Sequence, residues 1–345
     1  MKKLLLSFVV LPGALAMAQV GINTDEPKAM LDISAKGNQR GDLRIQDVKE
    51  EKSTQWLLIW DEKDNKLVKR TSLSEIKREI LNEIRIDYIR KKYPDRAGEI
   101  INKIKQCTPE NILFDKHFGD GKHDFVYCAT IVTETATNYN KTWLNLNLGA
   151  EYADIHSSDF NPTVNKTGET IHGDKNLYGS LYQWQRVSDG HEFRNRVRSR
   201  EKTFVKAPSW TNTDKAAGKF IFEDPNWVEG GENASGSDLA LWRAGGRNNP
   251  CPSGYHVPTL EEWEELLKAV RQVGSSQDVL PNLAAAGYYY YLDGLLSYED
   301  SGGYYWSSSA SDRNFAHHMY FNSGNSGANG RSSRANGFSV RCIKN

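Results

Sequence analysis

The chain has 345 residues, which is enough for two or three modules. Its 44 Lys and Arg residues equal its 44 Asp and Glu residues, so the formal net charge is zero. Such a balance lacks the one-sided field that draws proteins to nucleic acid or to acidic substrates, and we expect no nucleic-acid partner. Aromatic residues are plentiful, with 9 Trp and 16 Tyr, and they supply most of the candidates for a binding face.

Residues 1–18 have the three parts of a secretory signal peptide. Lys2 and Lys3 form a positive start, residues 4–15 form a short apolar run, and residues 16–18 form a small-x-small cleavage site before Gln19. The apolar run is too short to remain as a bilayer span, and no later stretch is long enough to replace it. The sequence therefore predicts an exported protein, extracellular or at the outer cell surface, with no membrane span after signal cleavage.

The cysteines indicate disulfides. An even number of cysteines in an exported chain favours pairing, and four of them allow three connectivities. The two local pairs are the ones we expect, because the first brackets a short excursion of the chain and the second brackets the C-terminal half of the last domain. No Cys-x-x-Cys spacing occurs, so a zinc site or a thioredoxin-type redox site is not indicated. The predicted disulfides are Cys107 with Cys128 and Cys251 with Cys342.

Residues 19–71 form a predicted β-rich module of short strands. Apolar residues alternate with polar ones at 31–33 and 43–45, and a strand pair is expected at 56–60 and 67–68. The pattern VGINT followed by LDI resembles the strand repeats in the shafts of bacterial cell-surface and phage-tail-like fibres. That resemblance implies a fibre-like module and a possible homotrimer, since small strand pairs bury too little surface alone.

Residues 72–106 read as a helical connector. Ser72 and Glu75 fit a capping box, and Pro94 should end the first helix before a second one begins at residue 97. One interpretation is a short coiled coil that sets an oligomer, and the other is an amphipathic linker lying on its own domain. Both remain open at this point. The apolar stripe of the first helix consists of Leu73, Ile76, Ile80 and Ile84.

Residues 107–345 read as one domain with many strands, long loops and few helices. Strands are expected at 124–133 and 141–148, and a short helix or turn at 178–184. The stretch from 189 to 249 is irregular and rich in Gly, Asn and Trp, and loops of that length are usually functional. A helix is expected at 260–270, where Thr259 and Glu262 fit a capping box.

Six motifs in this domain occur in one order, over residues 129–345. They are NKTWLNLNLGA, YGSLYQWQR, NPCPSGYHVPTLEEWEELL, LAAAGY, GGYYWSSS and GFSVRCIKN. Together they resemble the Fibrobacter succinogenes major paralogous domain family, found in exported proteins of Bacteroidetes-like bacteria. The resemblance implies an α+β fold of the C-type-lectin-like and formylglycine-generating-enzyme-like type, but no known ligand. Gln185 stands where that family usually has Gly, which argues against a tight turn there.

Catalytic and metal-binding chemistry is not indicated. The oxidation chemistry of formylglycine-generating relatives uses paired reactive cysteines, whereas Cys342 has a predicted disulfide partner. His317 and His318 are expected on a strand, where only one of them can face inward, so they cannot chelate together. The run from Glu223 to Trp227 superficially resembles lectin calcium elements, but its spacing differs, and we interpret it as a turn. We therefore predict no enzyme activity, no metal and no cofactor.

The favoured function is recognition of an extracellular glycan or protein through loops of the C-terminal domain. Aromatic faces stack on sugars or anchor interfaces, and amide or guanidinium groups add directed hydrogen bonds. The tract from 322 to 333 is expected to form an adaptable second loop. The alternative for the tryptophans is that they fill the core, and the alternative for the protein is a structural subunit of a surface appendage. The candidate ligand-binding residues are Trp210, Trp227, Trp242, Arg243, Asn322 and Asn325.

Overall fold

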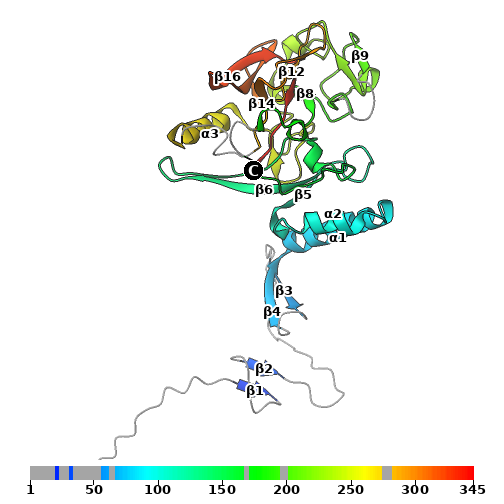
Figure 1. Ribbon diagram of the computed structural model, residues 1–345, viewed down its shortest axis with the longest axis vertical. Coiled ribbons are helices and arrows are strands. Elements are labelled where there is room, and N and C mark those ends of the chain that lie inside the picture. Colours follow the sequence, from blue (N-terminus) through cyan, green and yellow to red (C-terminus); the bar gives the residue numbers. More distant parts are fainter. Residues whose placement is uncertain are drawn as a thin grey trace, which may run out of the picture. The chain divides into compact units, whose positions relative to one another are not determined.

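The computed structural model describes residues 20–22, 31–33, 56–61, 67–166, 171–194, 201–273 and 282–345 (Figure 1). The chain divides into two compact units, residues 1–76 and 77–345. The predicted signal peptide and the predicted strand at 43–45 lie outside the described residues. Among the described residues, none of the helices combines the length and the apolar character that crossing a bilayer requires.

The described residues of the first unit form two strand pairs. β1 (Val20–Ile22) pairs in parallel with β2 (Leu31–Ile33). β3 (Trp56–Asp61) pairs antiparallel with β4 (Leu67–Ser72), which confirms the strand pair expected at these positions. Such small strand pairs are marginal by themselves, because they bury little apolar surface.

Two helices follow, α1 (Leu73–Lys92) and α2 (Ala97–Ile104). The break between them falls at Pro94, as expected, since proline cannot donate the helical hydrogen bond. The face of α1 that packs on the domain differs from the predicted stripe. Among the α1 residues whose burial is described, Ile86 and Ile89 are buried, and they pack in a cluster with α2 and with β5 and β6.

One five-stranded sheet carries the beginning and the end of the second unit. Its strand order is β11-β18-β7-β6-β5, so the terminal strand β18 lies between β11 and β7. The C-terminal end of the chain thus returns to the first strands of this domain. The strands are β5 (Ile112–Phe114), β6 (Val126–Glu134), β7 (Tyr139–Leu144), β11 (Tyr255–His256) and β18 (Ile343–Lys344).

Both predicted disulfides are confirmed. Cys107 is joined to Cys128, and Cys251 is joined to Cys342, each with Cα atoms 5.9 Å apart. The second bridge links residues separated by 91 positions and ties the segment before β11 to the residue that precedes β18. On the chain-entropy model such a long loop stabilises the fold by ~4 kcal/mol.

A seven-stranded sheet forms the other half of the domain, with the order β13-β12-β17-β14-β15-β16 and β8 paired to β17. β8 lies where a short helix or turn was expected, so that part of the prediction is wrong. The tract expected to be an adaptable loop is also a strand, β16. The strands are β8 (Leu181–Gln183), β12 (Tyr288–Tyr289), β13 (Leu296–Ser297), β14 (Gly302–Ala310), β15 (Phe315–Asn322), β16 (Ser326–Ser333) and β17 (Gly337–Ser339).

The remaining regular elements are short, apart from α3. β9 (Glu201–Thr203) and β10 (Lys219–Ile221) form a parallel pair in the irregular region. The mixture of helices and sheets confirms the predicted α+β class. The 3-10 turns are η1 (Pro109–Asn111), η2 (Glu151–Ala153), η4 (Lys175–Leu177), η5 (Asp214–Ala216), η6 (Gly231–Asn233) and η7 (Gly236–Leu239).

Helix α3 (Leu260–Val273) begins with the predicted capping box. The backbone N–H of Glu262 donates to the Thr259 hydroxyl at 3.2 Å, and the N–H of Thr259 donates to the Glu262 carboxylate at 2.8 Å. α3 packs beside β14, β15 and β16, as Figure 1 also shows. Its buried residues Trp263, Leu266 and Leu267 belong to one cluster with side chains of these strands.

Gln185 corrects the expectation for the turn after β8. Its φ is +59°, in the left-handed region where glycine is favoured, so the turn is tight although the residue is not Gly. Two hydrogen bonds hold this buried residue. Its side-chain oxygen accepts from the N–H of Leu241 at 3.1 Å, and its carbonyl accepts from the side chain of Asn248 at 2.9 Å.

Candidate functional site

The three tryptophans proposed for a ligand-binding face lie in the core. Trp227 and Trp242 are 0% exposed and Trp210 is 6% exposed. The indole N–H of Trp227 donates to the carbonyl of Trp184 at 2.7 Å, and its ring packs edge-on against Trp210. No ring face is left for a sugar, so the structure supports the alternative that these residues fill the core. The physical reason is that a long segment with little regular structure needs large side chains to anchor it.

The other three candidate residues are exposed. Arg243 lies in the turn region before Cys251, while Asn322 and Asn325 lie at the turn between β15 and β16. The Asn322 side-chain oxygen accepts hydrogen bonds from the N–H groups of Gly324 and Asn325, at 3.1 and 3.0 Å. Asn322 therefore closes the turn, whereas no described residue contacts the Asn325 side chain by a hydrogen bond. The structure does not bring these asparagines together with the tryptophans.

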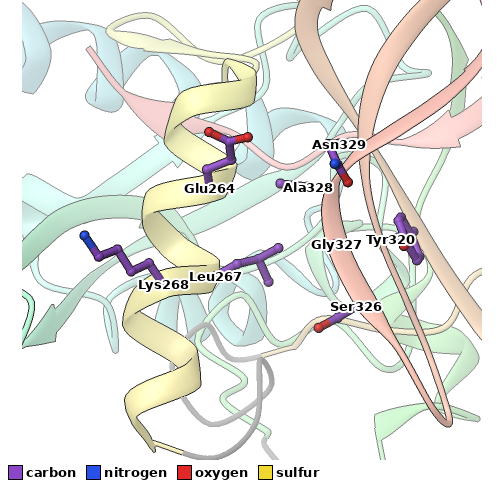
Figure 2. A pocket seen from close by; sticks show the side chains of 8 residues that line it. All are labelled: Glu264, Leu267, Lys268, Tyr320, Ser326, Gly327, Ala328 and Asn329. Atoms are coloured by element: carbon purple, nitrogen blue, oxygen red, sulfur yellow. The ribbon is translucent and has the colours of Figure 1, made fainter.

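A groove lies beside this hairpin, between α3 and β16. It has a volume of about 470 Å³. Figure 2 shows Glu264 and Lys268 on the helix and Tyr320, Ser326 and Asn329 on the hairpin, with Leu267 between them. The lining residues are Glu264, Leu267, Lys268, Tyr320, Ser326, Gly327, Ala328 and Asn329.

A bulge shapes the hairpin wall of the groove. His318 pairs with Gly330 and Tyr320 pairs with Gly327, so Met319 alone opposes two residues of β16. Those two residues are Ala328, which is buried, and Asn329, which is exposed and lines the groove. Bulges at sheet edges redirect side chains and end strand pairing. This bulge therefore places Asn329 in the groove and makes the edge strand unsuitable for adding another strand.

Glycines are needed on β16 because large rings lie across from them. A Cβ on Gly330 would be 2.4 Å from the His318 ring, and one on Gly327 would be 3.0 Å from the Tyr320 ring. The Gly-rich tract is thus a strand that accommodates its neighbours. Sequence reasoning missed this, although the aromatic strand immediately before the tract was the available signal.

Three polar side chains that line the groove make no hydrogen bond or ion pair with another described residue. Among the described residues, Glu264, Lys268 and Asn329 have no hydrogen-bond or ion-pair partner, and all three are exposed. An exposed carboxylate offers acceptors only, an amide offers both donors and acceptors, and an ammonium offers donors only. Glu264 and Asn329 thus give the groove acceptors and a donor, whereas Figure 2 shows the Lys268 side chain extending from α3 away from the hairpin and the Tyr320 ring on the far side of the hairpin strands.

A second hollow of about 310 Å³ lies where η2 and η4 meet. Its charges are partly paired already, since the Arg194 guanidinium donates to the Glu299 carboxylate at 2.7 Å. The Arg194 cation also covers the ring of Tyr178, with 4.8 Å between the guanidinium carbon and the ring centroid. The groove beside α3 is therefore the better candidate, because its polar groups have no such partners.

A buried cluster of acids and histidines offers a possible metal site, which we tested on its donors. The ligand atoms of Asp189, His191 and Glu192 lie within 4.8 Å of one another. However, Arg186 donates to Asp189 at 2.7 Å, and His123 contacts Glu192 at 2.9 Å. The carboxylates of Asp189 and Glu192 thus already accept hydrogen bonds from Arg186 and His123, and Arg186 adds a buried positive charge. The cluster is an ion network within the protein.

The pKa values in this network follow from its contacts. Burial disfavours a charge on His123, but hydrogen bonds and attraction from Glu192 outweigh burial and raise the pKa of His123 to about 9. Burial likewise opposes the Glu192 charge, but hydrogen bonds from His123 and His191 lower the pKa of Glu192 to about 2. The His123–Glu192 pair is thus ionised at neutral pH.

Comparisons with known proteins assign no activity to the groove. A model of a domain of unknown function, DUF8237, matches residues 271–343. This range holds the hairpin wall of the groove and excludes most of α3. No curated protein and no solved structure gives a significant match to the chain.

Proposed function

We propose that this is an exported, non-enzymatic recognition protein that binds a glycan in the groove between α3 and β16. The proposal includes a C-type-lectin-like fold and membership of the major paralogous domain family. The α+β architecture, the return of the terminal strand and the disulfide between Cys251 and Cys342 support that relationship. Disulfides are also compatible with an oxidising, extracellular location.

The proposal rests on the groove between α3 and β16, which has a size suitable for a ligand and is lined by polar side chains without partners among the described residues. Ligand sites commonly have volumes of ~300–1,000 Å³ and a few directed polar groups, and the groove of about 470 Å³ falls in this range. Sugar hydroxyls both donate and accept, so Glu264 and Asn329 can each bind one or two of them.

A glycan fits the groove better than an extended peptide does. A peptide that added to β16 would need a regular run of backbone donors and acceptors along the edge. The bulge at Ala328 and Asn329 interrupts that run. We therefore propose a glycan as the ligand, and binding of a protein instead of a glycan would contradict this part of the proposal.

An oxidase of the formylglycine-generating type is not favoured. All four cysteines of the chain are in disulfides. A reactive cysteine acts as its thiolate, which a disulfide cannot provide. Titration of the unreduced protein should find no free thiol, and two or more free thiols would revive the enzymatic alternative.

A glycan array with the full mature chain tests the proposal. The variants Glu264→Gln and Asn329→Ala should each lower the affinity for a bound glycan at least about tenfold, which is ~1.4 kcal/mol. Arg243→Ala is the matched control, since Arg243 is exposed but does not line the groove. Loss of binding in the control alone would move the site to the irregular region. Absence of binding by the wild type, together with open-ended assembly, would favour the structural-subunit alternative.

A further inference from the structure

Helix α1 carries an exposed apolar stripe that its own domain leaves uncovered. The side chains of Ile80, Leu81 and Ile84 are 55%, 50% and 60% exposed, respectively. At 100° per residue, Ile80 and Ile84 lie on the opposite side of the helix from Ile86 and Ile89, which pack on the domain. The helix is therefore apolar on two sides, of which only one is buried among the described residues.

Two charged residues frame the stripe symmetrically. Lys77 lies three residues before Ile80, and Asp87 lies three residues after Ile84. Both are exposed and lie on the same side of the helix as the two isoleucines, and the Asp87 carboxylate also accepts a hydrogen bond from Arg90 of its own helix at 2.7 Å. The spacing of Lys77, Ile80, Ile84 and Asp87 is symmetric. Reversing the helix direction therefore places a lysine where an aspartate was and an isoleucine where the other isoleucine was, and we call this order a palindrome.

This order distinguishes the two ways in which copies of α1 could pack. In a parallel, in-register bundle, each Lys77 would face another Lys77 and each Asp87 another Asp87, which is repulsive. In an antiparallel pair, Lys77 of each copy faces Asp87 of the other, and Ile80 of each faces Ile84 of the other. Opposite charges at the ends and apolar contact in the centre then occur together.

We propose that two copies of this chain associate through α1 in an antiparallel, two-fold symmetric pair. A two-fold interface uses the same patch on both copies, as this palindrome requires. Three exposed side chains supply much less than the ~800 Å² per partner of a standard interface. The pair should therefore form and dissociate with concentration. The homotrimer expected from the fibre-like module is parallel and is the competing arrangement.

Sedimentation of the full mature chain over a range of concentrations is the first test. The wild type should show a monomer–dimer equilibrium, and Ile80→Glu should raise its dissociation constant at least about tenfold. Ile131→Glu is the matched control, because Ile131 of β6 is 61% exposed but lies outside the stripe. A wild type that stays monomeric at all concentrations, or equal effects of both variants, would overturn the proposal.

Charge exchange and cross-linking test the orientation. Lys77→Asp alone and Asp87→Lys alone should each weaken the dimer, and the double exchange should restore it. Under oxidising conditions, a mixture of Ile80→Cys and Ile84→Cys chains should form a disulfide-linked heterodimer. Efficient cross-linking of Ile80→Cys with itself would indicate parallel packing and would overturn the antiparallel arrangement, as would a trimer mass.

Discussion

The irregular region from 189 to 249 and the hairpin of β15 and β16 are opposites in what they expose. The first has the composition of a binding loop, with Trp, Asn and Gly, yet its tryptophans are buried. The second is a strand ladder interrupted by one bulge, and that bulge brings Asn329 to a groove. In this domain, buried aromatic side chains anchor the irregular chain, while the strand hairpin carries accessible polar groups.

The contrast teaches that exposure depends on what a segment needs for its own stability. An irregular segment has little ladder for its backbone groups, so turns and side chains satisfy them together. Arg186 shows this, because its guanidinium donates to the carbonyls of Ala216 and Lys219 as well as to Asp189. A strand hairpin has its ladder already, and its side chains are free for other contacts.

Removal of a tryptophan from the irregular region should produce the largest effect. Trp227→Ala deletes a fully buried ring and leaves the carbonyl of Trp184 without its donor. We expect a loss of ~3–5 kcal/mol in the free energy of unfolding, measured by chemical denaturation. Arg243→Ala in the same region should change it by less than ~0.5 kcal/mol. Equal effects of the two would show that the tryptophan is not a core residue.

The ion network should give the irregular region a dependence on pH that the groove lacks. The raised pKa of His123 stabilises the fold fully below pH ~6.5, and this is lost as pH rises through about 9. The lowered pKa of Glu192 stabilises it fully above pH ~4.5, and this is lost as pH falls toward about 2. The rise of the His123 pKa to about 9 corresponds to ~3 kcal/mol in the free energy of unfolding.

Thermal unfolding between pH 3 and 10 measures this dependence. Glu192→Gln should lower the melting temperature most between pH 4.5 and 6.5 and should flatten the profile above pH 7. Glu264→Gln, which changes an exposed carboxylate of the groove, should leave the profile as it is in the wild type. A profile that Glu192→Gln does not alter would mean that the pair adds nothing to stability.

Local signals predicted much of this fold, and contacts between distant residues decided the rest. Thr259 and Glu262 predicted the start of α3, because the two hydrogen bonds of a capping box join residues that are close in the sequence. The disulfides followed from the export signal and the cysteine positions. By contrast, β16 was interpreted as a loop, because the reason for its glycines is the ring of His318 on the neighbouring strand. The groove was missed for the same reason, since its two walls are joined only by tertiary packing.

A smaller effect is expected from adding one methyl group to β16. Gly330→Ala would place a Cβ 2.4 Å from the buried His318 ring, and the strand must shift, at a cost of ~1–3 kcal/mol. Gly324→Ala is the control, because a Cβ at this turn position meets nothing within 4 Å. Chemical denaturation should separate the two variants. If they were equally stable, the register between β15 and β16 would need revision.

The smallest effects concern the two asparagines of the hairpin turn, and they separate a structural residue from a binding residue. Asn322→Ala removes the acceptor for two backbone N–H groups at an exposed turn, so we expect a loss of ~0.5–1 kcal/mol. Asn325→Ala removes no such bond and should change stability by less than ~0.5 kcal/mol. If glycan affinity falls in the Asn325 variant while stability stays constant, the ligand extends from the groove to the turn. If affinity falls only with Asn322→Ala, the turn supports the groove through its shape and does not contact the ligand.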